Sequence, residues 1–219
     1  MNFDYYGFDA YGTLFNVHSA VARHHDLVGP MADRVSEIWR NKQLEYSWTR
    51  NSMGKYREFW LLTEQALDFA LAVVPGANKS AKPQLMSAYQ SLDCYDDVTP
   101  VLRQLQAGGA KTAILSNGSP AMLQSAVDNA GIAALLDEVI SVDTIKTYKT
   151  TQTVYALVSD VFGVKADEVS FQSSNRWDIA GAKTFGFYCQ WINRTGQPDE
   201  YADLSPNKIH QDLTGLIKP

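Results

Sequence analysis

Short apolar runs rich in β-branched and aromatic residues alternate along this chain with longer stretches whose apolar positions recur every three or four residues. The short runs predict strands at residues 3–9, 111–116, 138–142, 168–172 and 186–191. Helical spacing is clearest before the second and fourth runs, at Val98, Val101, Leu102 and Leu105 and at Val154, Leu157, Val158 and Val161. This alternation predicts an α/β fold with a Rossmann-like core, a doubly wound and mostly parallel sheet. The more polar tail after Asn193 is predicted to be a loop followed by a short terminal helix.

The connection between the first two predicted strands is too long for a simple crossover and contains no convincing strand. Its helical patterns include Val35, Ile38 and Trp39, with Tyr46 further on, and the stretch of residues 59–71. A four- to five-helix insertion here would cover the carboxyl end of the first strand, enclose a site and keep out water. We therefore expect a catalytic core of residues 1–15 and 93–219 and an all-helical cap of residues 16–92.

Composition narrows the class of protein. A chain of 219 residues with 45% hydrophobic and 20% charged residues is typical of a globular protein with a real core. The net charge of −5 argues against binding to nucleic acid or to an anionic membrane. No apolar run approaches the ~20 residues of a membrane span, and the N-terminus lacks a signal-peptide pattern, so a cytoplasmic protein is expected. Cys94 and Cys189 are not in metal-ligand spacing and are expected to be buried thiols.

Polar clusters follow four of the predicted strands. They contain Asp9 and Thr13, then Ser116-Asn117-Gly118, then Lys146-Thr147-Tyr148-Lys149, and finally the stretch from Ser173 to Asp178. Taken alone, Asn117 could form a turn, Asp178 could cap a helix, and Lys149 could be an exposed lysine. A carboxylate such as Asp9 at the end of a buried strand is costly unless the protein uses it. Because the carboxyl ends of parallel strands meet at one edge of a sheet, the four clusters together predict a catalytic site there.

The order of these motifs resembles the haloacid dehalogenase superfamily over almost the whole chain. Its phosphatase members carry Asp-x-Asp-x-Thr after the first strand, where the second Asp protonates the leaving alkoxide, and acids after the fourth strand help to hold Mg²⁺. In this chain the stretch is Asp9-Ala10-Tyr11-Gly12-Thr13, so a phenol stands where the proton donor would be. An alkoxide benefits strongly from a general acid, whereas halide leaves without a proton. A nucleophilic carboxylate with no acid beside it is therefore suited to displacing halide from carbon.

The closer resemblance is to the L-2-haloacid dehalogenase branch. Its motifs here are Asp-Ala-Tyr-Gly-Thr-Leu at residues 9–14, Trp39-Arg40, Leu44-Glu45-Tyr46-Ser47-Trp48, Leu115-Ser116-Asn117-Gly118, Tyr148-Lys149, Ser173-Ser174-Asn175 and Trp177-Asp178. The resemblance implies hydrolysis of short L-2-haloalkanoic acids, haloacetates included, to D-2-hydroxy acids through a covalent aspartyl ester. It implies a 2-haloacid substrate, halide as a product, no cofactor and no metal. Because members often form dimers, it also implies a homodimer.

The resemblance assigns catalytic roles by position. Asp9 would be the nucleophile, Arg40 and Asn117 would hold the departing halide, and Asp178 would position or deprotonate the water that attacks the ester. Ser116 and Lys149, with backbone N–H groups near Tyr11, would bind the substrate carboxylate, and Lys149 would keep Asp9 ionised. The groups that steer or support this network would be Asn175, Thr13, Tyr155 and Ser173.

The implied substrate contacts are Ala10, Tyr11, Arg40, Leu44, Phe59, Ser116, Asn117, Lys149 and Trp177. Among them, Tyr11, Leu44, Phe59 and Trp177 would form an apolar wall around the alkyl group and the halogen. Plainer alternatives remain open. Arg40 could pair with Glu37 or Glu45 on its own helix, Leu44, Phe59 and Trp177 could be ordinary core, and Tyr155 could be half-buried filler.

Four residues depart from the pattern of the branch. Asn16 replaces a usual Asp, Thr150 replaces a proline and leaves the Lys149 loop without a fixed φ, and Gln172 replaces an apolar residue. Arg176 adds a cation close to Trp177, expected to face outward. Two rival functions stay open: a Mg²⁺-dependent phosphatase on the same scaffold, and a catalytically inactive binding protein.

Overall fold

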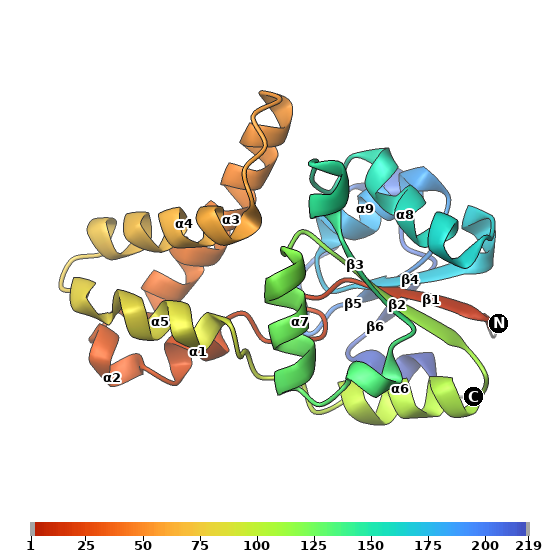
Figure 1. The fold of residues 1–219 in the computed structure, drawn as a ribbon, viewed down its shortest axis with the longest axis horizontal. Coiled ribbons are helices and arrows are strands. Elements are labelled where there is room, and N and C mark those ends of the chain that lie inside the picture. The colour runs from red at the N-terminus through yellow and green to blue at the C-terminus, as the bar shows by residue number, and fades with distance from the viewer. Residues whose placement is uncertain (1–2, 218–219) are drawn as a thin grey trace.

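The computed structural model describes residues 3–217, in which six parallel strands form a single sheet (Figure 1). The strands are β1 (Tyr5–Phe8), β2 (Lys111–Ser116), β3 (Glu138–Ser141), β4 (Val169–Ser173), β5 (Tyr188–Ile192) and β6 (Lys208–His210). Their order across the sheet is β3-β2-β1-β4-β5-β6, and every neighbouring pair is parallel. The predicted doubly wound α/β core is confirmed, and β1 and β4 lie at its centre.

Helices cover both faces of the sheet. They are α6 (Val98–Ala107), α7 (Pro120–Asn129), α8 (Gln152–Phe162) and α9 (Arg176–Phe185), with α8 and α9 on the face opposite α6 (Figure 1). All four apolar positions predicted for α6 are buried, because they share one side of the helix. In α8 the predicted stripe is buried only in part: Val154 and Val158 are inside, whereas Val161 is exposed.

The helices between β1 and α6 form a separate cap region beside the sheet (Figure 1). They are α1 (Ser19–Ala22), α2 (His25–Val28), α3 (Ala32–Ser52), α4 (Phe59–Val73) and α5 (Lys82–Tyr89). The predicted helical insertion is therefore confirmed. Its two connections to the core lie side by side, since the N–H of Asn16 donates to the carbonyl of Asp93 at 2.8 Å. The exact division at residues 15/16 and 92/93 stays a prediction.

The C-terminal part differs from the sequence prediction. Strand β6 extends the sheet beside β5, where a loop and a terminal helix were predicted. With three residues, Lys208-Ile209-His210, the strand is too short to show an alternating pattern. The short 3₁₀ turns are η1 (Lys79–Ala81), η2 (Ala133–Leu135), η3 (Val142–Ile145), η4 (Ala166–Glu168), η5 (Ala202–Leu204) and η6 (Leu213–Leu216).

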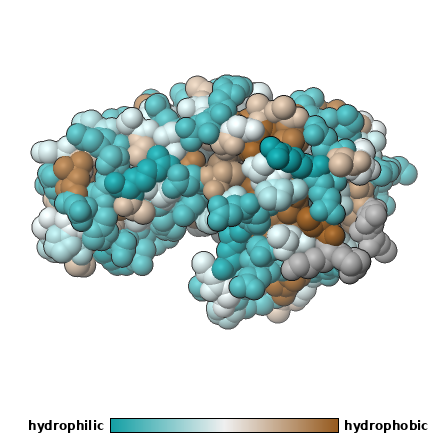
Figure 2. All heavy atoms as spheres, turned by 90° about the horizontal axis from the view of Figure 1, so that it is seen from below, coloured by the Kyte–Doolittle hydropathy of each residue, from teal (hydrophilic) through white to brown (hydrophobic). Residues whose placement is uncertain are grey.

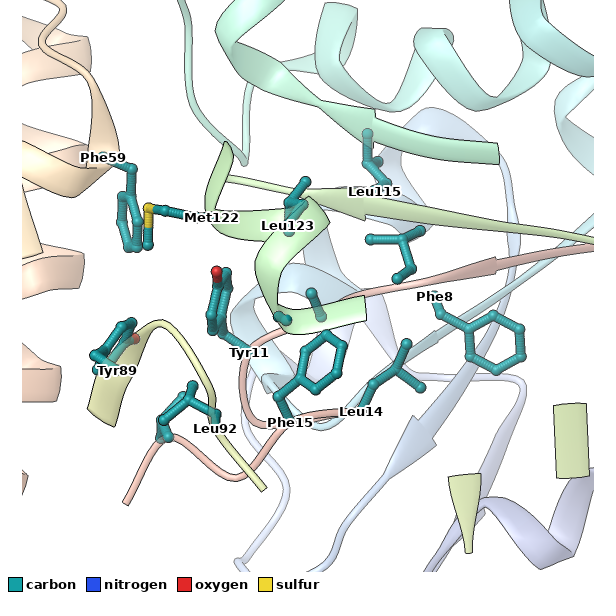
Figure 3. Close-up of a cluster of buried hydrophobic side chains, with 14 of the residues drawn as sticks. Phe8, Tyr11, Leu14, Phe15, Phe59, Tyr89, Leu92, Leu115, Met122 and Leu123 are labelled. Atoms are coloured by element: carbon teal, nitrogen blue, oxygen red, sulfur yellow. The ribbon is translucent and has the colours of Figure 1, made fainter. Parts of the chain in front are cut away.

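The apolar core continues from the sheet into the cap through Tyr11. Figure 3 shows Tyr11 with Leu14 and Phe15 on one side and the cap residues Phe59 and Tyr89 on the other. The ring centroid of Tyr11 lies 5.8 Å from that of Tyr89 and 6.3 Å from those of Phe59 and Phe15. Tyr11 is 4% exposed, so its ring is part of the contact between cap and core.

The surface is unremarkable in hydropathy. The face seen in Figure 2 carries mostly hydrophilic residues, with hydrophobic side chains gathered in smaller patches. Between residues 3 and 217, no helix is both long enough and apolar enough to pass through a lipid bilayer.

Candidate active site

Asp9 lies one residue beyond β1, at the carboxyl edge of the sheet. Its N–H donates to the carbonyl of Gln172 at 2.9 Å, which continues the pairing of β1 with β4 and fixes where the side chain begins. Three donors meet its buried carboxylate: Lys149 Nζ at 2.9 Å from Oδ1, and Thr13 Oγ1 at 2.9 Å and Asn175 Nδ2 at 2.8 Å from Oδ2. Hydrogen bonds to an ionised acceptor are strong ones, so this carboxylate is held firmly in place.

Lys149 joins Asp9 to a second buried carboxylate. Its Nζ lies 2.9 Å from Asp9 Oδ1 and 2.8 Å from Asp178 Oδ2, and Lys149 and Asp178 are 1% and 0% exposed. Burial alone would lower the pKa of Lys149, but the charges of Asp178 and Asp9 raise it above its ordinary value. One ammonium therefore holds two carboxylates in a site with little access to water.

Asp178 lies in the first turn of α9, is fully buried and has a displaced pKa. The pKa of Asp178 is raised to about 6: burial raises it most, the Lys149 ammonium lowers it, and the nearby Asp9 charge raises it. The Tyr155 hydroxyl donates to Asp178 Oδ1 at 2.8 Å, so the ring of Tyr155 is not filler. A carboxyl group that is ionised at neutral pH yet retains appreciable basicity is suited to act as a general base.

The turn after β1 is tied to the end of β4. Thr13 Oγ1 donates to Asp9 and accepts from the N–H of Ser174 at 2.7 Å. Ser173 Oγ accepts from the N–H of Asn175 at 3.1 Å, which orients the amide that reaches Asp9. The turn itself needs Gly12, whose φ of +97° disfavours other residues, and the carbonyl of the fully buried Ala10 closes it.

The end of β2 lies on the other side of Lys149. Asn117 Oδ1 accepts from the backbone N–H of Lys149 at 3.1 Å, so its amide Nδ2 remains as the donor of that side chain. Ser116 Oγ accepts from the N–H of Gly118 at 3.1 Å, which forms the tight turn after the strand. A Cβ on Gly118 would lie 2.8 Å from the ring of Tyr11, so the two strand ends approach closely only with glycine here.

Arg40 reaches this edge of the sheet from the cap helix α3. Its Nη2 donates to the carbonyl of Tyr11 at 3.1 Å and to Asn175 Oδ1 at 3.3 Å. The alternative in which Arg40 pairs with a glutamate of its own helix is not what the structure has. Glu37 pairs with Arg34 and Glu45 pairs with Lys42. A cap side chain therefore closes over the turn that follows Asp9.

The predicted apolar residues lie around this network and differ in how deeply they are buried. Phe59 is fully buried against Tyr11, and Leu44 is half-buried one turn beyond Arg40 on α3. Trp177 is half-buried and lies edge to face with Trp48 of α3, with ring centroids 5.3 Å apart. Beside this pair is a cavity of about 570 Å³, to which Lys149, Thr150 and Gly181 also contribute.

The structure thus brings most of the predicted polar residues into one hydrogen-bonded network. Its members are Asp9, Thr13, Arg40, Asn117, Lys149, Tyr155, Ser173, Asn175 and Asp178. Ser116 and Trp177 border it without a side-chain hydrogen bond into it in the described residues. Sequence reasoning missed Asn51 of α3, which contacts the loop of Lys149. The available signal was its spacing, because eleven residues after Arg40 is about three helical turns on the same side.

In residues 3–217 the cysteine thiols and the acidic side chains do not form a metal site. Cys189 is buried as expected, whereas Cys94 is only half-buried, and burial raises their pKa values to about 12 and about 11. Within residues 3–217 no three or more His, Cys, Asp or Glu side chains are placed to hold a metal ion together.

Comparisons with known proteins agree with this geometry. The family described as haloacid dehalogenase-like hydrolase matches residues 3–186. An "(S)-2-haloacid dehalogenase 4A" from Burkholderia cepacia is 47% identical over 205 residues, which cover 93% of this chain and 88% of that protein. This chain belongs to the L-2-haloacid dehalogenases. It is a hydrolase of that family, with the α/β core and helical cap described above.

Solved structures of the family superpose closely on this chain. A dehalogenase "with intermediate complex" has a TM-score of 0.94 and 44% identity, and the match covers 98% of this chain and 95% of that one. The L-2-haloacid dehalogenase from Xanthobacter autotrophicus with chloropropionic acid covalently bound has a TM-score of 0.86 and 36% identity, over 98% of this chain and 97% of that one.

The structure shows the surroundings of all four residues that depart from the L-2-haloacid dehalogenase pattern. Asn16 Oδ1 accepts from the N–H of His18 at 3.0 Å, which an aspartate would also do. Thr150 is exposed, and its side chain lies against Gly181 of α9. The expectation that Arg176 faces outward is wrong, because it is 5% exposed and pairs with Asp199 at 2.6 Å. Its guanidinium binds the segment after β5, which the sequence pattern could not bring close.

Gln172, the fourth departure, is fully buried in a row of hydrogen-bonded polar side chains that we name the polar ladder. The row runs from β6 to β4 through His210, Gln190, Ser170 and Gln172. His210 Nε2 lies 2.7 Å from Gln190 Oε1, and Gln190 Nε2 donates to Ser170 Oγ at 2.9 Å. With Gln172 Oε1 accepting from Ser170, its Nε2 donates to the carbonyl of Gly7 at 3.0 Å. Each member thus has a partner, and a polar residue is accommodated where an apolar one was expected.

Proposed function

We propose that this chain hydrolyses short L-2-haloalkanoic acids, haloacetates included, to D-2-hydroxy acids and halide. The observation that carries the proposal is the Asp9 carboxylate, oriented by three donors, with the buried ring of Tyr11 in place of an acid two residues later. The names of the relatives, and the covalently bound chloropropionic acid in one of them, support the same reaction.

In the first step a carboxylate oxygen of Asp9 would attack C2 of the substrate. The new C–O bond forms as the carbon–halogen bond breaks, and halide leaves with its electron pair on the opposite side, so C2 is inverted. Arg40 Nη2 is bound to Tyr11 and Asn175, and the remaining N–H groups of Arg40, with Asn117 Nδ2, would serve as donors for the departing anion. Lys149 has used two of its three ammonium donors, which leaves one for the substrate carboxylate.

In the second step water would attack the carbonyl carbon of the Asp9 ester. Asp178 takes a proton of the water and returns it to the leaving alkoxide oxygen as the acyl C–O bond breaks. The 2-hydroxy acid keeps the oxygen that came from Asp9, and the regenerated Asp9 carboxyl group releases its proton to solvent. Because this attack leaves C2 untouched, the inversion of the first step is preserved. Tyr155 and Lys149 hold Asp178, and Asn175 holds the carboxyl group of Asp9.

A single-turnover reaction in H₂¹⁸O with excess enzyme tests this scheme. The label is expected in the side-chain carboxylate of Asp9 and not in the first-formed 2-hydroxy acid. Label entering the first product directly would mean that water attacks the substrate without an ester.

Two other functions are distinguished by simple assays. A Mg²⁺-dependent phosphatase would hydrolyse p-nitrophenyl phosphate in a reaction abolished by EDTA and would release no halide from 2-chloropropionate. Tyr11 and Asn175 speak against it, since phosphatases of the superfamily carry acids at such positions. An inactive binding protein would form neither an ester nor a halide complex when crystals are soaked with a haloacid.

We also propose a homodimer, which rests on the family resemblance alone. Sedimentation equilibrium of the full chain tests it, and a mass of one chain, 24.4 kDa, at micromolar concentration would contradict it.

A further inference from the structure

Asn51 lies near the end of the cap helix α3 and binds the core loop that carries Lys149. Its Oδ1 accepts from the Thr147 hydroxyl at 2.6 Å and from the backbone N–H of Tyr148 at 3.1 Å, and its Nδ2 donates to Thr151 Oγ1 at 2.8 Å. One side chain therefore makes three hydrogen bonds to residues about a hundred positions away in the sequence. This uses most of the hydrogen-bonding capacity of an asparagine.

Thr151 of this loop makes the contact with Asn51 in place of a local hydrogen bond within its own helix. Thr151 is the N-cap residue of α8, where a threonine hydroxyl ordinarily accepts from an N–H of the first helical turn. Here the side chain of Thr151 makes no such bond, and its oxygen accepts from Asn51 instead. A hydroxyl turned away from its own helix indicates that the contact with the cap determines the conformation of the loop.

Two asparagines hold consecutive N–H groups of this loop. Asn51 of the cap accepts from the N–H of Tyr148, and Asn117 of the core accepts from the N–H of Lys149. The side chain of Lys149 then spans the short distance to Asp9 and Asp178. A displacement of the cap at Asn51 would therefore reach the backbone of Lys149 through one peptide unit, and the ammonium through the side chain of that lysine.

We infer that Asn51 is a positioning residue that couples the placement of the cap to the placement of Lys149 between the two carboxylates. The inference rests on the proposed function for its catalytic consequence, but its structural part does not need a substrate. Asn51 touches neither Asp9 nor Asp178, so it acts on the reaction only through the loop of residues 147–151.

Replacement of Asn51 by alanine tests the coupling. Asn51→Ala is expected to lower kcat for halide release about ten- to a hundredfold with a smaller change in KM, because a small displacement of a catalytic group has such effects. It is also expected to speed amide hydrogen exchange in residues 147–151. Asn51→Asp, which keeps the acceptor for Tyr148 and Thr147 and lets the Thr151 hydroxyl donate, is expected to retain most of the rate.

The acid limb of the kcat profile is a further readout. The groups around Asp178 are Lys149 from the loop, Tyr155 from α8 and Asp9 after β1. A looser Lys149 favours the ionised form of Asp178 less, so the limb should move to higher pH by about 0.5–1 unit in Asn51→Ala. A merely structural role of Asn51 would leave the limb where it is.

Tyr56→Phe is the matched control. It removes another hydrogen bond between cap and core, from the Tyr56 hydroxyl to Asp143 Oδ1 at 2.6 Å. It keeps the ring that packs against Tyr148, with centroids 5.0 Å apart, and the three hydrogen bonds of Asn51 to residues 147–151. It is expected to keep the kcat, the acid limb and the amide exchange of the wild type. An equal loss of rate in Tyr56→Phe and Asn51→Ala would overturn the inference, because any cap contact would then serve.

The outcomes separate the inference from the proposed function. If Asn51→Ala matches the wild type in rate, acid limb and exchange, the inference fails while the dehalogenase activity stands. If the wild type releases no halide from any 2-haloacid but Asn51→Ala still exchanges faster, the proposed function fails and the coupling stands. Should Asn51→Ala not fold, Thr151→Val removes only the hydroxyl partner and is expected to show the same changes in smaller measure.

Discussion

Two clusters of buried polar side chains meet at the end of β4 and differ in almost every physical respect. The charged cluster, Asp9, Lys149 and Asp178, lies beyond the strands and holds two carboxylates against one ammonium. The polar ladder lies within the sheet and consists of two amides, a hydroxyl and an imidazole, each with a hydrogen-bond partner and none of them a carboxylate or an ammonium. Burial displaces the pKa of Asp178 in the first, which is characteristic of sites that perform chemistry.

The difference in charge between the two clusters indicates which buried polar groups are structural and which are functional. A neutral group that finds its partner costs little and fixes the packing of the sheet. Burying a charge costs far more free energy. Because two carboxylates face one ammonium, part of that cost is not compensated. We therefore expect substitutions in the charged cluster to affect the reaction and substitutions in the ladder to affect stability alone.

The largest effect is expected from Asp9→Asn. Without the nucleophile no ester can form, so halide release should fall by at least ~10⁴-fold, while the free energy of unfolding changes little because one buried charge is removed. Steady-state halide release and urea denaturation measure the two quantities.

Asp178→Asn should instead let the ester accumulate, seen by mass spectrometry as intact protein plus substrate minus halide. An adduct on Asp9→Asn would contradict the assignment of the nucleophile.

Lys149→Met should show the cost of the unequal charges. Removing the ammonium leaves two buried carboxylates unpaired, and the variant should lose about 3–5 kcal/mol of stability at pH 7. Part of that loss should be recovered at pH 5. The folded variant then binds a proton that the unfolded chain, with an ordinary Asp pKa near 3.8, does not bind, so its stability rises as the pH falls.

Lys111→Met is the control for this substitution. Lys111 pairs with Asp137 at 2.7 Å, but its side chain is 59% exposed, and the loss of such a surface pair costs only about 0–1 kcal/mol. Thermal or urea denaturation of both variants at pH 5 and pH 7 makes the comparison. Equal losses in the two variants would show that the burial of Lys149 has no energetic consequence.

How far the sequence predicts these clusters depends on how local their signals are. The charged cluster was predicted because polar residues follow strands whose carboxyl ends must meet at one edge of the sheet. The ladder was not, since it links Gln172 and Ser170 of β4 to Gln190 of β5 and His210 of β6, and β6 has no pattern of its own. A buried amide next to an apolar run looks like an exception until the neighbouring strands are in place.

The same reason explains what the residues alone left open or wrong around the site. Arg40 could be placed on a helix, but whether it would pair with a glutamate or reach Tyr11 depends on how α3 of the cap is oriented toward the carboxyl edge of the sheet. Arg176 was expected to face outward because Asp199, its partner, is in a segment without periodicity. Contacts between distant segments are set by packing, and a single sequence does not contain their geometry.

Gln172→Leu should separate the ladder from the reaction. The substitution leaves the Ser170 hydroxyl without its acceptor and removes the side-chain donor to the carbonyl of Gly7, and should cost about 1–3 kcal/mol of stability. The kcat of the folded enzyme should stay within about twofold of the wild type, since no charged group is disturbed. Gln106→Leu, which removes an exposed bond to Ala134, is the control and should cost less than about 0.5 kcal/mol. A rate loss that matches the loss of stability would mean that the two clusters are coupled.

The smallest effect is expected where a neutral group touches the charged cluster, at Tyr155. In the wild type kcat should fall about tenfold per pH unit below pH 6, because Asp178 with a pKa of about 6 must be ionised to take the proton of the water. The Tyr155 hydroxyl donates to the ionised carboxylate and so favours it. Tyr155→Phe should therefore move the acid limb upward by about 0.5–1 unit and leave the plateau at high pH within about twofold of the wild type. A limb that stays in place while the plateau falls would instead give Tyr155 a role in holding α8 against α9.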